Sequence, residues 1–94
     1  MNEEEVSIPF STDWSEEEIV KVVHFFTLVD RAYGEGVRAG ELLNAYNQFK
    51  KVVPAKDEEK TYFRDYDKRA GQLCWRTVQM ARKAEDPDTV VRHT

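Results

Sequence analysis

The side chains best suited to chemistry lie in the stretch STDWSEEEIVKVVHFF, residues 11–26, where carboxylates and hydroxyls precede His24. Such groups could bind a metal ion or transfer protons. A metal site on one helix needs ligands three or four residues apart, as in H-E-x-x-H. The residues at these distances from His24 are Val20, Lys21, Thr27 and Leu28. None of them is a metal ligand, so we expect His24 on the polar side of a helix and not in a metal or general-base site.

The same stretch has the pattern of a helix start. Ser15 is followed three residues later by Glu18, which is the spacing of a capping box. Trp14 and Ile19 occupy the two positions of a hydrophobic staple. The glutamates in between fall in the first turn, where the helix dipole favours negative charge. The acidic residues are therefore predicted to begin a helix.

Two other segments resemble ligand-binding motifs but fail on spacing. Residues 65–71 look like the start of a calcium loop, yet Arg69, Ala70 and Arg76 stand at its fifth, sixth and twelfth positions. Residues 34–36 read Gly-Glu-Gly, but no strand precedes them and no G-K-[ST] or G-x-G-x-x-G follows. We expect no catalytic, cofactor-binding or metal-binding residues, and no cofactor.

The single cysteine, Cys74, cannot form an internal disulfide, which agrees with a reducing compartment. Arg76 is near in sequence, but such close positions on a helix do not face each other. A nucleophilic thiol would also need a positioned base, and neither His24 nor His93 is an obvious one. We therefore expect Cys74 to serve as a small buried hydrophobic residue.

Length and composition bound the class of protein. Ninety-four residues make one domain, predicted over residues 1–94. Hydrophobic residues at 40% and charged residues at 34% suit a globule with a charged exterior. No apolar run approaches the ~18 residues of a membrane span, and the acidic start MNEEEV does not resemble a secretory signal. We expect a cytoplasmic protein without a membrane partner.

Charge is distributed unevenly along the chain, whose net charge is −4. Residues 1–47 hold three basic and ten acidic side chains, and residues 48–94 hold eleven basic and eight acidic ones. The net negative charge argues against nucleic acid as the main partner. Two interpretations stay open: the halves face each other within one bundle, or the asymmetry steers an unknown protein partner or a second copy in a weak homodimer.

Hydrophobic periodicity predicts helices at about residues 16–33, 39–53, 56–70 and 72–84. Glycine after the first segment, Pro54 after the second and the Asp-Pro-Asp of 86–88 after the last should end helices. Gly71 is either a C-cap or a kink, so the last two segments could be one helix. Residues Cys74, Trp75, Val78 and Ala81 are expected to face inward.

The predicted fold class is all-α. Short connections favour a compact up-and-down bundle of three long helices plus a short C-terminal fourth helix, with no sheet. The ordered core should cover about residues 8–85, with Ile8-Pro9-Phe10 as an extended strap. Residues 1–7 and 86–94 are expected to be flexible tails.

One possible interaction surface combines aromatic and basic residues. Tyr62 does not share the helix face of the aromatic residues that follow it, and Arg76, Arg82 and Lys83 should point outward. Exposed aromatic and basic side chains together are typical of protein interfaces. The alternative is that the four are scattered surface residues.

Several segments resemble one family. Residues 8–20 read IPFSTDWSEEEIV, similar to the pattern Y-P-L-x-x-D-W-[ST]-x-E-E-[IV] of the YktA-like proteins, a small uncharacterised family of Bacillus-type bacteria. Further matching segments are residues 25–33, 42–50, 52–60 and 71–76. The resemblance implies an all-helical protein without an assigned activity or site residues. The chain departs from the pattern at Ala55, where a serine cap is common, which leaves the start of the third helix open.

We expect a non-enzymatic protein-interaction or regulatory module. Two alternatives remain. One is a small enzyme with an inter-helix site built from His24, Asp30 or tyrosines, and the other is a nucleic-acid accessory protein that uses the basic second half.

Replacing the predicted N-cap tests the first helix start. Ser15→Ala should lower the free energy of unfolding by about 1 kcal/mol, because one backbone N–H loses its acceptor. Chemical denaturation of both proteins measures the difference, and equal stabilities would show that the helix begins elsewhere.

Overall fold

The computed structural model describes residue 11 and residues 13–93. Its elements are α1 (Glu16–Ala32), β1 (Val37–Arg38), α2 (Ala39–Val52), α3 (Lys56–Ala70), α4 (Cys74–Lys83) and β2 (Val90–Val91). The predicted fold class is confirmed: four helices lie close to the expected ranges, with the addition of a two-stranded sheet. The predicted strap at residues 8–10 and the predicted tail at 1–7 lie outside the described residues.

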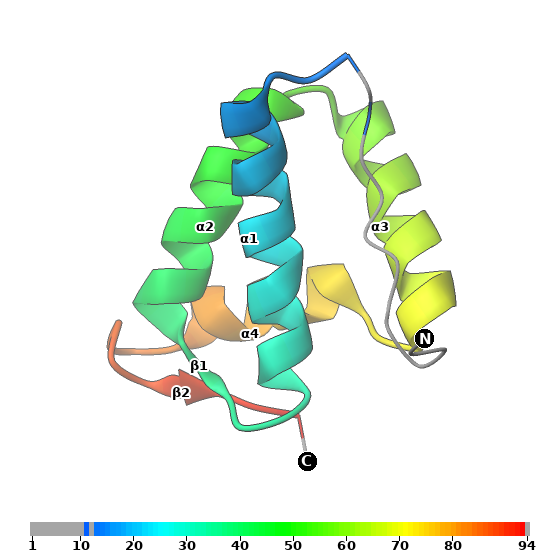
Figure 1. Cartoon of the computed structure of the whole chain (residues 1–94). Helices are drawn as coiled ribbons and strands as arrows, with labels where there is room; N and C mark the ends of the chain where they lie inside the picture. Colours follow the sequence, from blue (N-terminus) through cyan, green and yellow to red (C-terminus); the bar gives the residue numbers. More distant parts are fainter. Residues whose placement is uncertain (1–10, 12, 94) are drawn as a thin grey trace.

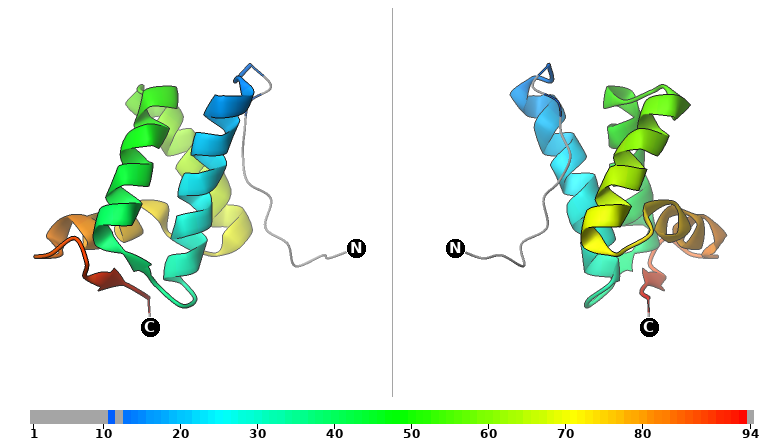
Figure 2. Two further views of the ribbon diagram at one scale, coloured as in Figure 1. Left: turned by 60° about the vertical axis from the view of Figure 1, so that its left-hand side comes forward. Right: turned by 90° about the vertical axis from the view of Figure 1, so that its right-hand side faces the viewer.

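The three long helices run up and down, and α4 crosses their ends. In Figure 1, α1 lies between α2 and α3, and α4 runs across the lower end of all three. The views in Figure 2 show the same crossing from two further sides. Only residues 53–55 separate α2 from α3, so these helices meet at one end. Among the helices of the described part, none has the length and hydropathy needed to cross a bilayer.

The start of α1 has the predicted capping box. Ser15 Oγ accepts a hydrogen bond from the Glu18 amide at 3.2 Å, and the Glu18 carboxylate accepts one from the Ser15 amide at 2.9 Å. Trp14, just before this cap, packs on Tyr62 of α3 with ring centroids 5.3 Å apart. The helix start is therefore also a contact between α1 and α3.

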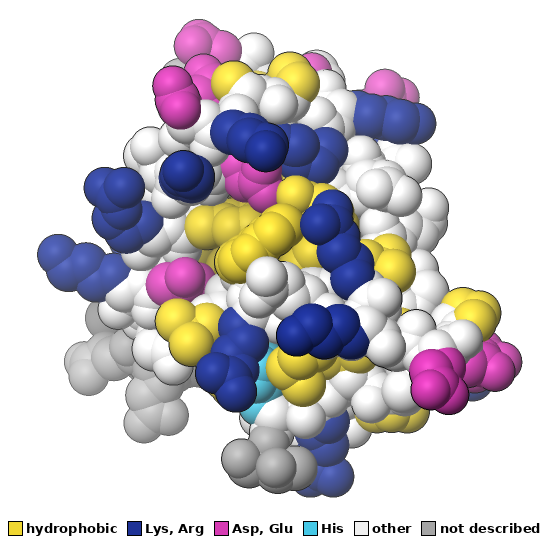
Figure 3. All heavy atoms as spheres, turned by 180° about the vertical axis from the view of Figure 1, so that it is seen from behind, with side chains coloured by type: hydrophobic (Ala, Val, Ile, Leu, Met, Phe, Trp, Pro, Cys, Tyr) yellow, Lys and Arg dark blue, Asp and Glu magenta, His cyan; other side chains and the backbone are white. Residues whose placement is uncertain are grey.

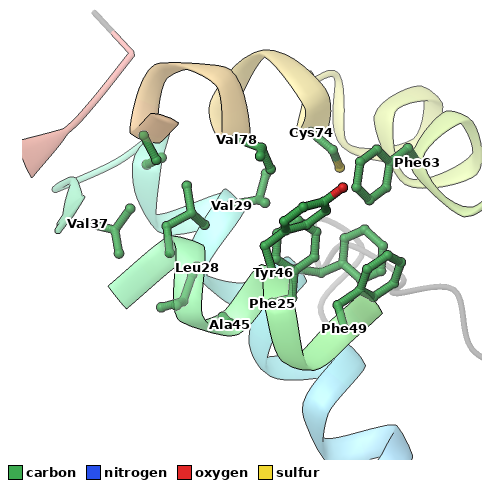
Figure 4. Packing of buried hydrophobic residues seen from close by; sticks show 14 of the residues in the cluster. Phe25, Leu28, Val29, Val37, Ala45, Tyr46, Phe49, Phe63, Cys74 and Val78 are labelled. Carbon is green, nitrogen blue, oxygen red and sulfur yellow. The ribbon is translucent and has the colours of Figure 1, made fainter. Parts of the chain in front are cut away.

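An aromatic cluster joins the three long helices. Phe25 of α1 lies at its centre, with ring centroids 5.1 Å from Phe49 of α2 and 5.7 Å from Phe63 of α3. Tyr66 of α3 stacks on Phe26 of α1 at 4.7 Å. Figure 4 shows Phe25, Tyr46, Phe49 and Phe63 close together, with α4 contributing Cys74 and Val78. Rings from all three long helices thus meet in one core cluster.

The inward orientation predicted for Trp75 is wrong. Its side chain is 41% exposed, whereas Cys74, Thr77, Val78 and Ala81 are buried. Adjacent helical positions differ by about 100°, so a face that buries Cys74 turns Trp75 toward solvent. Thr77 is buried on this face of α4, and its hydroxyl donates to the Leu73 carbonyl at 2.8 Å.

α3 and α4 are separate helices. Gly71 has φ +67°, the left-handed conformation that ends a helix and suits glycine. Asp67 then accepts a hydrogen bond from the Cys74 amide at 2.9 Å, which supports the first turn of α4. At the other end, α3 begins at Lys56 as predicted, although Ala55 offers no side-chain cap.

The expectation of no sheet is wrong. β1 pairs antiparallel with β2, with Val37 opposite Val91 and Arg38 opposite Val90. The strands are too short to show the alternation that identifies strands in sequence. Val91 is buried, and the His93 amide donates to the Ala32 carbonyl at 2.8 Å. Where the sequence predicts a flexible tail, the structure thus places residues 90–93 against the end of α1.

Gly40 allows the C-terminal segment to approach α2 closely. Its amide donates to the Pro87 carbonyl at 2.9 Å, and a Cβ at this position would lie 2.9 Å from Pro87 Cβ and 3.3 Å from Pro87 O. Carbon atoms do not normally approach so closely, so a side chain here would displace the segment that leads into β2.

Gly40→Ala tests this contact. Alanine improves helix propensity by up to about 1 kcal/mol, but overpacking costs about 1–3 kcal/mol, so we expect a net loss of stability. Asn44→Ala, at an exposed position of the same helix, is the control and should leave stability equal or slightly higher. Urea denaturation compares the two, and a stabilising Gly40→Ala would contradict the close packing.

Candidate functional site

The four residues predicted as an interaction surface lie in different surroundings. Tyr62 is half-buried against Trp14. Arg82 lies in a groove between helices, and Arg76 lines a different hollow. Lys83 is exposed at the last residue of α4. Of the four, only Arg82 therefore belongs to the groove described next.

The groove is a hollow of about 810 Å³ between α2, α3 and α4. Its lining residues are Tyr46, Asn47, Lys50, Lys56, Glu59, Lys60, Phe63, Arg64, Asp67, Trp75 and Arg82. Figure 3 shows the face opposite that of Figure 1. Hydrophobic side chains lie in its centre, and lysines and arginines surround them. The groove thus combines an aromatic floor with a cationic rim.

A buried carboxylate connects the two long walls of the groove. Glu59 of α3 accepts a hydrogen bond from Tyr46 Oη at 2.6 Å and from Lys50 Nζ at 2.7 Å, both on α2. Lys50 Nζ also donates to the Pro54 carbonyl at 3.2 Å. Burial, then the bond to Glu59, raises the pKa of Tyr46, so its hydroxyl remains a donor. The three side chains hold the groove walls in place.

Arg82 covers the aromatic end of the groove. Its guanidinium carbon lies 5.2 Å from the centroid of the Trp75 ring and 5.5 Å from that of Tyr46. These distances allow cation–π attraction, which is stronger at partly desolvated sites. Arg82 therefore keeps its charge at the surface while it orients the exposed tryptophan.

Three further cations form a row along α3. Lys56, Lys60 and Arg64 follow one another at intervals of four residues, so they share one side of the helix. Within residues 11 and 13–93, none of the three forms an ion pair, since the pairs found are Arg31–Glu35, Lys50–Glu59 and Arg69–Asp65. The row is therefore available to an anionic ligand.

The side chains that the sequence analysis considered for catalysis or metal binding do not lie together in one site. His24 is exposed on α1, and the Asp30 carboxylate accepts a hydrogen bond from Gln72 at 2.8 Å. Cys74 is buried as predicted, and burial raises the pKa of its thiol, which disfavours the nucleophilic thiolate. In the described part of the chain, no three carboxylate, imidazole or thiol groups gather as a metal site requires.

The second hollow belongs to the C-terminal segment. It is lined by Tyr33, Leu73, Arg76, Met80, Arg92 and His93. The His93 ring stacks on Tyr33 with centroids 3.8 Å apart, and its Nε2 lies 2.8 Å from Thr77 Oγ1. Burial and the nearby Arg76 charge lower the pKa of His93, which favours the neutral ring. His93 thus anchors the chain end to α1 and α4.

Sequence reasoning missed most of the groove. The four-residue spacing of Lys56, Lys60 and Arg64 is visible in the sequence and could have indicated a basic helix side. The partners of Glu59 could not be found this way, because Tyr46 and Lys50 belong to another helix.

Comparison with known proteins gives consistent matches over most of the chain. Residues 5–90 match the uncharacterised protein family UPF0223. A UPF0223 protein of Bacillus pumilus is 42% identical over 88 residues, 94% of this chain and 98% of the relative. One from Lysinibacillus sphaericus is 42% identical over 82 residues, covering 87% and 86%. One from Staphylococcus aureus is 43% identical over 75 residues, covering 80% and 82%.

Two neighbouring glutamates allow a matched test of the groove wall. Glu59→Gln should lower the free energy of unfolding by about 1–3 kcal/mol, because two hydrogen bonds to a buried charge are weakened. Glu58→Gln, in the same helical turn but exposed, should change it by less than about 0.5 kcal/mol. Chemical denaturation gives both values, and equal effects would show that Glu59 does not hold α2 to α3.

Proposed function

The chain belongs to the uncharacterised protein family UPF0223, and from this premise we propose that it is a non-enzymatic protein-interaction or regulatory module. The groove between α2, α3 and α4 would be its binding surface. The proposal includes a single domain that acts in the cytoplasm. The observation that carries it is the exposed Trp75 ring at the end of a groove with a cationic rim.

The residue types of the groove support this function. Tryptophan, tyrosine and arginine are enriched among the residues that dominate binding energy at protein interfaces. Here Trp75, Tyr46 and Arg82 form one contiguous cluster. A partner that covered Trp75 would remove a large apolar ring from water, which contributes favourably to association.

The rigidity of the groove supports it further. Tyr46 and Lys50 hold Glu59, and Arg82 lies across the aromatic rings. Side chains that are fixed before binding lose less conformational entropy when a partner arrives. The groove is therefore organised in the free protein.

The distribution of charge supports the interpretation that the basic second half attracts a partner, and not the one in which it pairs with the acidic first half. In the described part of the chain, each ion pair joins residues of the same half of the sequence. Apart from Lys50 and Arg69, which form ion pairs within the second half, the basic side chains described there form no ion pair and could raise the encounter rate with an external partner. The groove cations Lys56, Lys60 and Arg64 belong to this half.

The alternatives have less support. An enzyme built from His24 or Asp30 would need these groups at a common hollow, and neither lines the groove. A nucleic-acid accessory protein would depend on clustered cations, whereas the chain as a whole has a net charge of −4.

Capture of partners by the full-length tagged protein in its native cell tests the proposal. Trp75→Ala should deplete the specifically captured proteins by about tenfold, the effect of losing one dominant interface residue. Leu73→Ala, which removes an exposed apolar side chain outside the groove, should retain them. Quantitative mass spectrometry compares the three samples, with circular dichroism to verify folding.

The sequence-predicted surface has its own variant, Arg76→Glu with Lys83→Glu. If captured proteins are lost in this variant and kept with Trp75→Ala, the binding surface lies outside the groove. Capture that is the same for all variants would contradict both surfaces.

A further inference from the structure

We propose that the groove binds an acidic peptide segment of a partner protein, with one large apolar side chain placed beside Trp75. This inference rests on the proposed function, because it names the chemistry of the partner for the same groove. Three observations carry it: the row of cations on α3, the aromatic floor, and the hydrogen bonds that the groove's own carboxylates already form within the protein.

The spacing of the α3 cations matches a peptide backbone. A helix rises about 1.5 Å per residue, so Lys56, Lys60 and Arg64 repeat at about 6 Å. In an extended peptide, alternate side chains point the same way and repeat at about 6.6 Å. Carboxylates at alternate positions of an extended peptide would therefore each meet one cation of the row.

The groove's carboxylates are already engaged and do not compete for this row. Glu59 is held by Lys50 and Tyr46. Asp67 accepts a hydrogen bond from the Cys74 amide, at the junction of α3 and α4. The surplus positive charge of the groove, five cations against two carboxylates, is thus complementary to an anion.

The aromatic end of the groove fits an apolar anchor. Tyr46 and Phe63 are buried except at their edges, and Trp75 is 41% exposed. These three aromatic residues line the groove together with its cations. Figure 3 shows hydrophobic side chains beside lysines and arginines on this face. A phenylalanine or leucine here would bury its own side chain and much of the Trp75 ring, which a purely acidic ligand would leave in water.

A peptide fits better than a single-stranded nucleic acid. The row of three cations spans only about 12 Å along α3. Proteins that bind single strands stack successive bases on several aromatic side chains, and of the aromatic residues that line this groove only Trp75 is exposed.

Fluorescence anisotropy with a labelled synthetic peptide tests the inference on the full-length protein. The probe carries glutamate at alternate positions and one central phenylalanine. Replacing its glutamates by glutamine, or its phenylalanine by alanine, should each weaken binding by about tenfold. Added salt should weaken binding of the glutamate probe more than that of the glutamine probe.

Variants of the protein locate the binding. Lys60→Glu with Arg64→Glu, and separately Trp75→Ala, should each raise the dissociation constant by about tenfold. The control is Lys51→Glu with Lys68→Glu, which changes net charge equally at exposed positions of α2 and α3 outside the groove. It should bind as the unaltered protein does. Thermal denaturation verifies that all variants fold.

The outcomes separate this inference from the proposed function. If the probe does not bind while Trp75-dependent partner capture persists, the acidic peptide is the wrong ligand and the interaction module stands. If the probe binds equally to the groove and control variants, the groove is not its site and this inference is wrong, whereas loss of the proposed function requires that partner capture also be independent of Trp75. Tighter binding of a mixed-sequence single-stranded oligonucleotide would show that the groove binds nucleic acid and not an acidic peptide. A dimer that Trp75→Ala dissociates would show that a second copy of the chain binds there.

Discussion

The carboxylate of Glu59 connects α2 to α3, and the shape of the candidate surface depends on this connection. The two helices are joined by the short link of residues 53–55 and by packing of Phe49 on Phe63. Within the groove they are also bridged by Glu59 with Tyr46 and Lys50. A carboxylate removed from water is costly unless charged or hydrogen-bonded partners surround it. Both hydrogen-bond partners of Glu59 come from α2. The cost of removing this carboxylate from water is therefore offset only when α3 lies close enough to α2 for both hydrogen bonds to form. This arrangement leaves a groove between the helices instead of a closed contact.

The core and the groove share residues. A chain of 94 residues has little interior, and six aromatic rings from three helices fill much of it. The outer edges of this cluster, Tyr46 and Phe63, are also the floor of the groove. The surface proposed to bind a partner is therefore positioned by the same packing that stabilises the fold. Trp75 and Arg82 add the exposed part from α4.

Membership of UPF0223 and the groove lead to one interpretation. Several polar and reactive groups of the described residues have structural roles: Ser15 and Glu18 cap α1, Asp67 supports α4, and Cys74 is buried. The groups that remain in the groove, cations beside aromatic rings, are suited to recognition. An acidic segment with an apolar anchor is the ligand whose chemistry complements them.

Local signals in the sequence determined the helices and their ends. The Ser15–Glu18 pair and Pro54 act within a few residues of themselves, so their effects could be predicted before any packing was known. For Gly71 the sequence left two possibilities, a C-cap or a kink, and the structure shows the C-cap. Hydrophobic periodicity likewise predicted four helices close to their observed ranges. On α4, which has only ten residues, hydrophobicity alone misplaced Trp75.

Only the tertiary structure decided the contacts between distant segments. Val37 pairs with Val91, Trp14 packs on Tyr62, and Glu59 binds side chains of α2. Of these contacts, the one made by Glu59 lies within the groove, where Arg82 also lies, whereas Arg76 lines the second hollow. Each depends on the angle and distance at which helices pack. Those quantities result from the whole core at once, whereas a helix start or stop results from a few neighbouring residues.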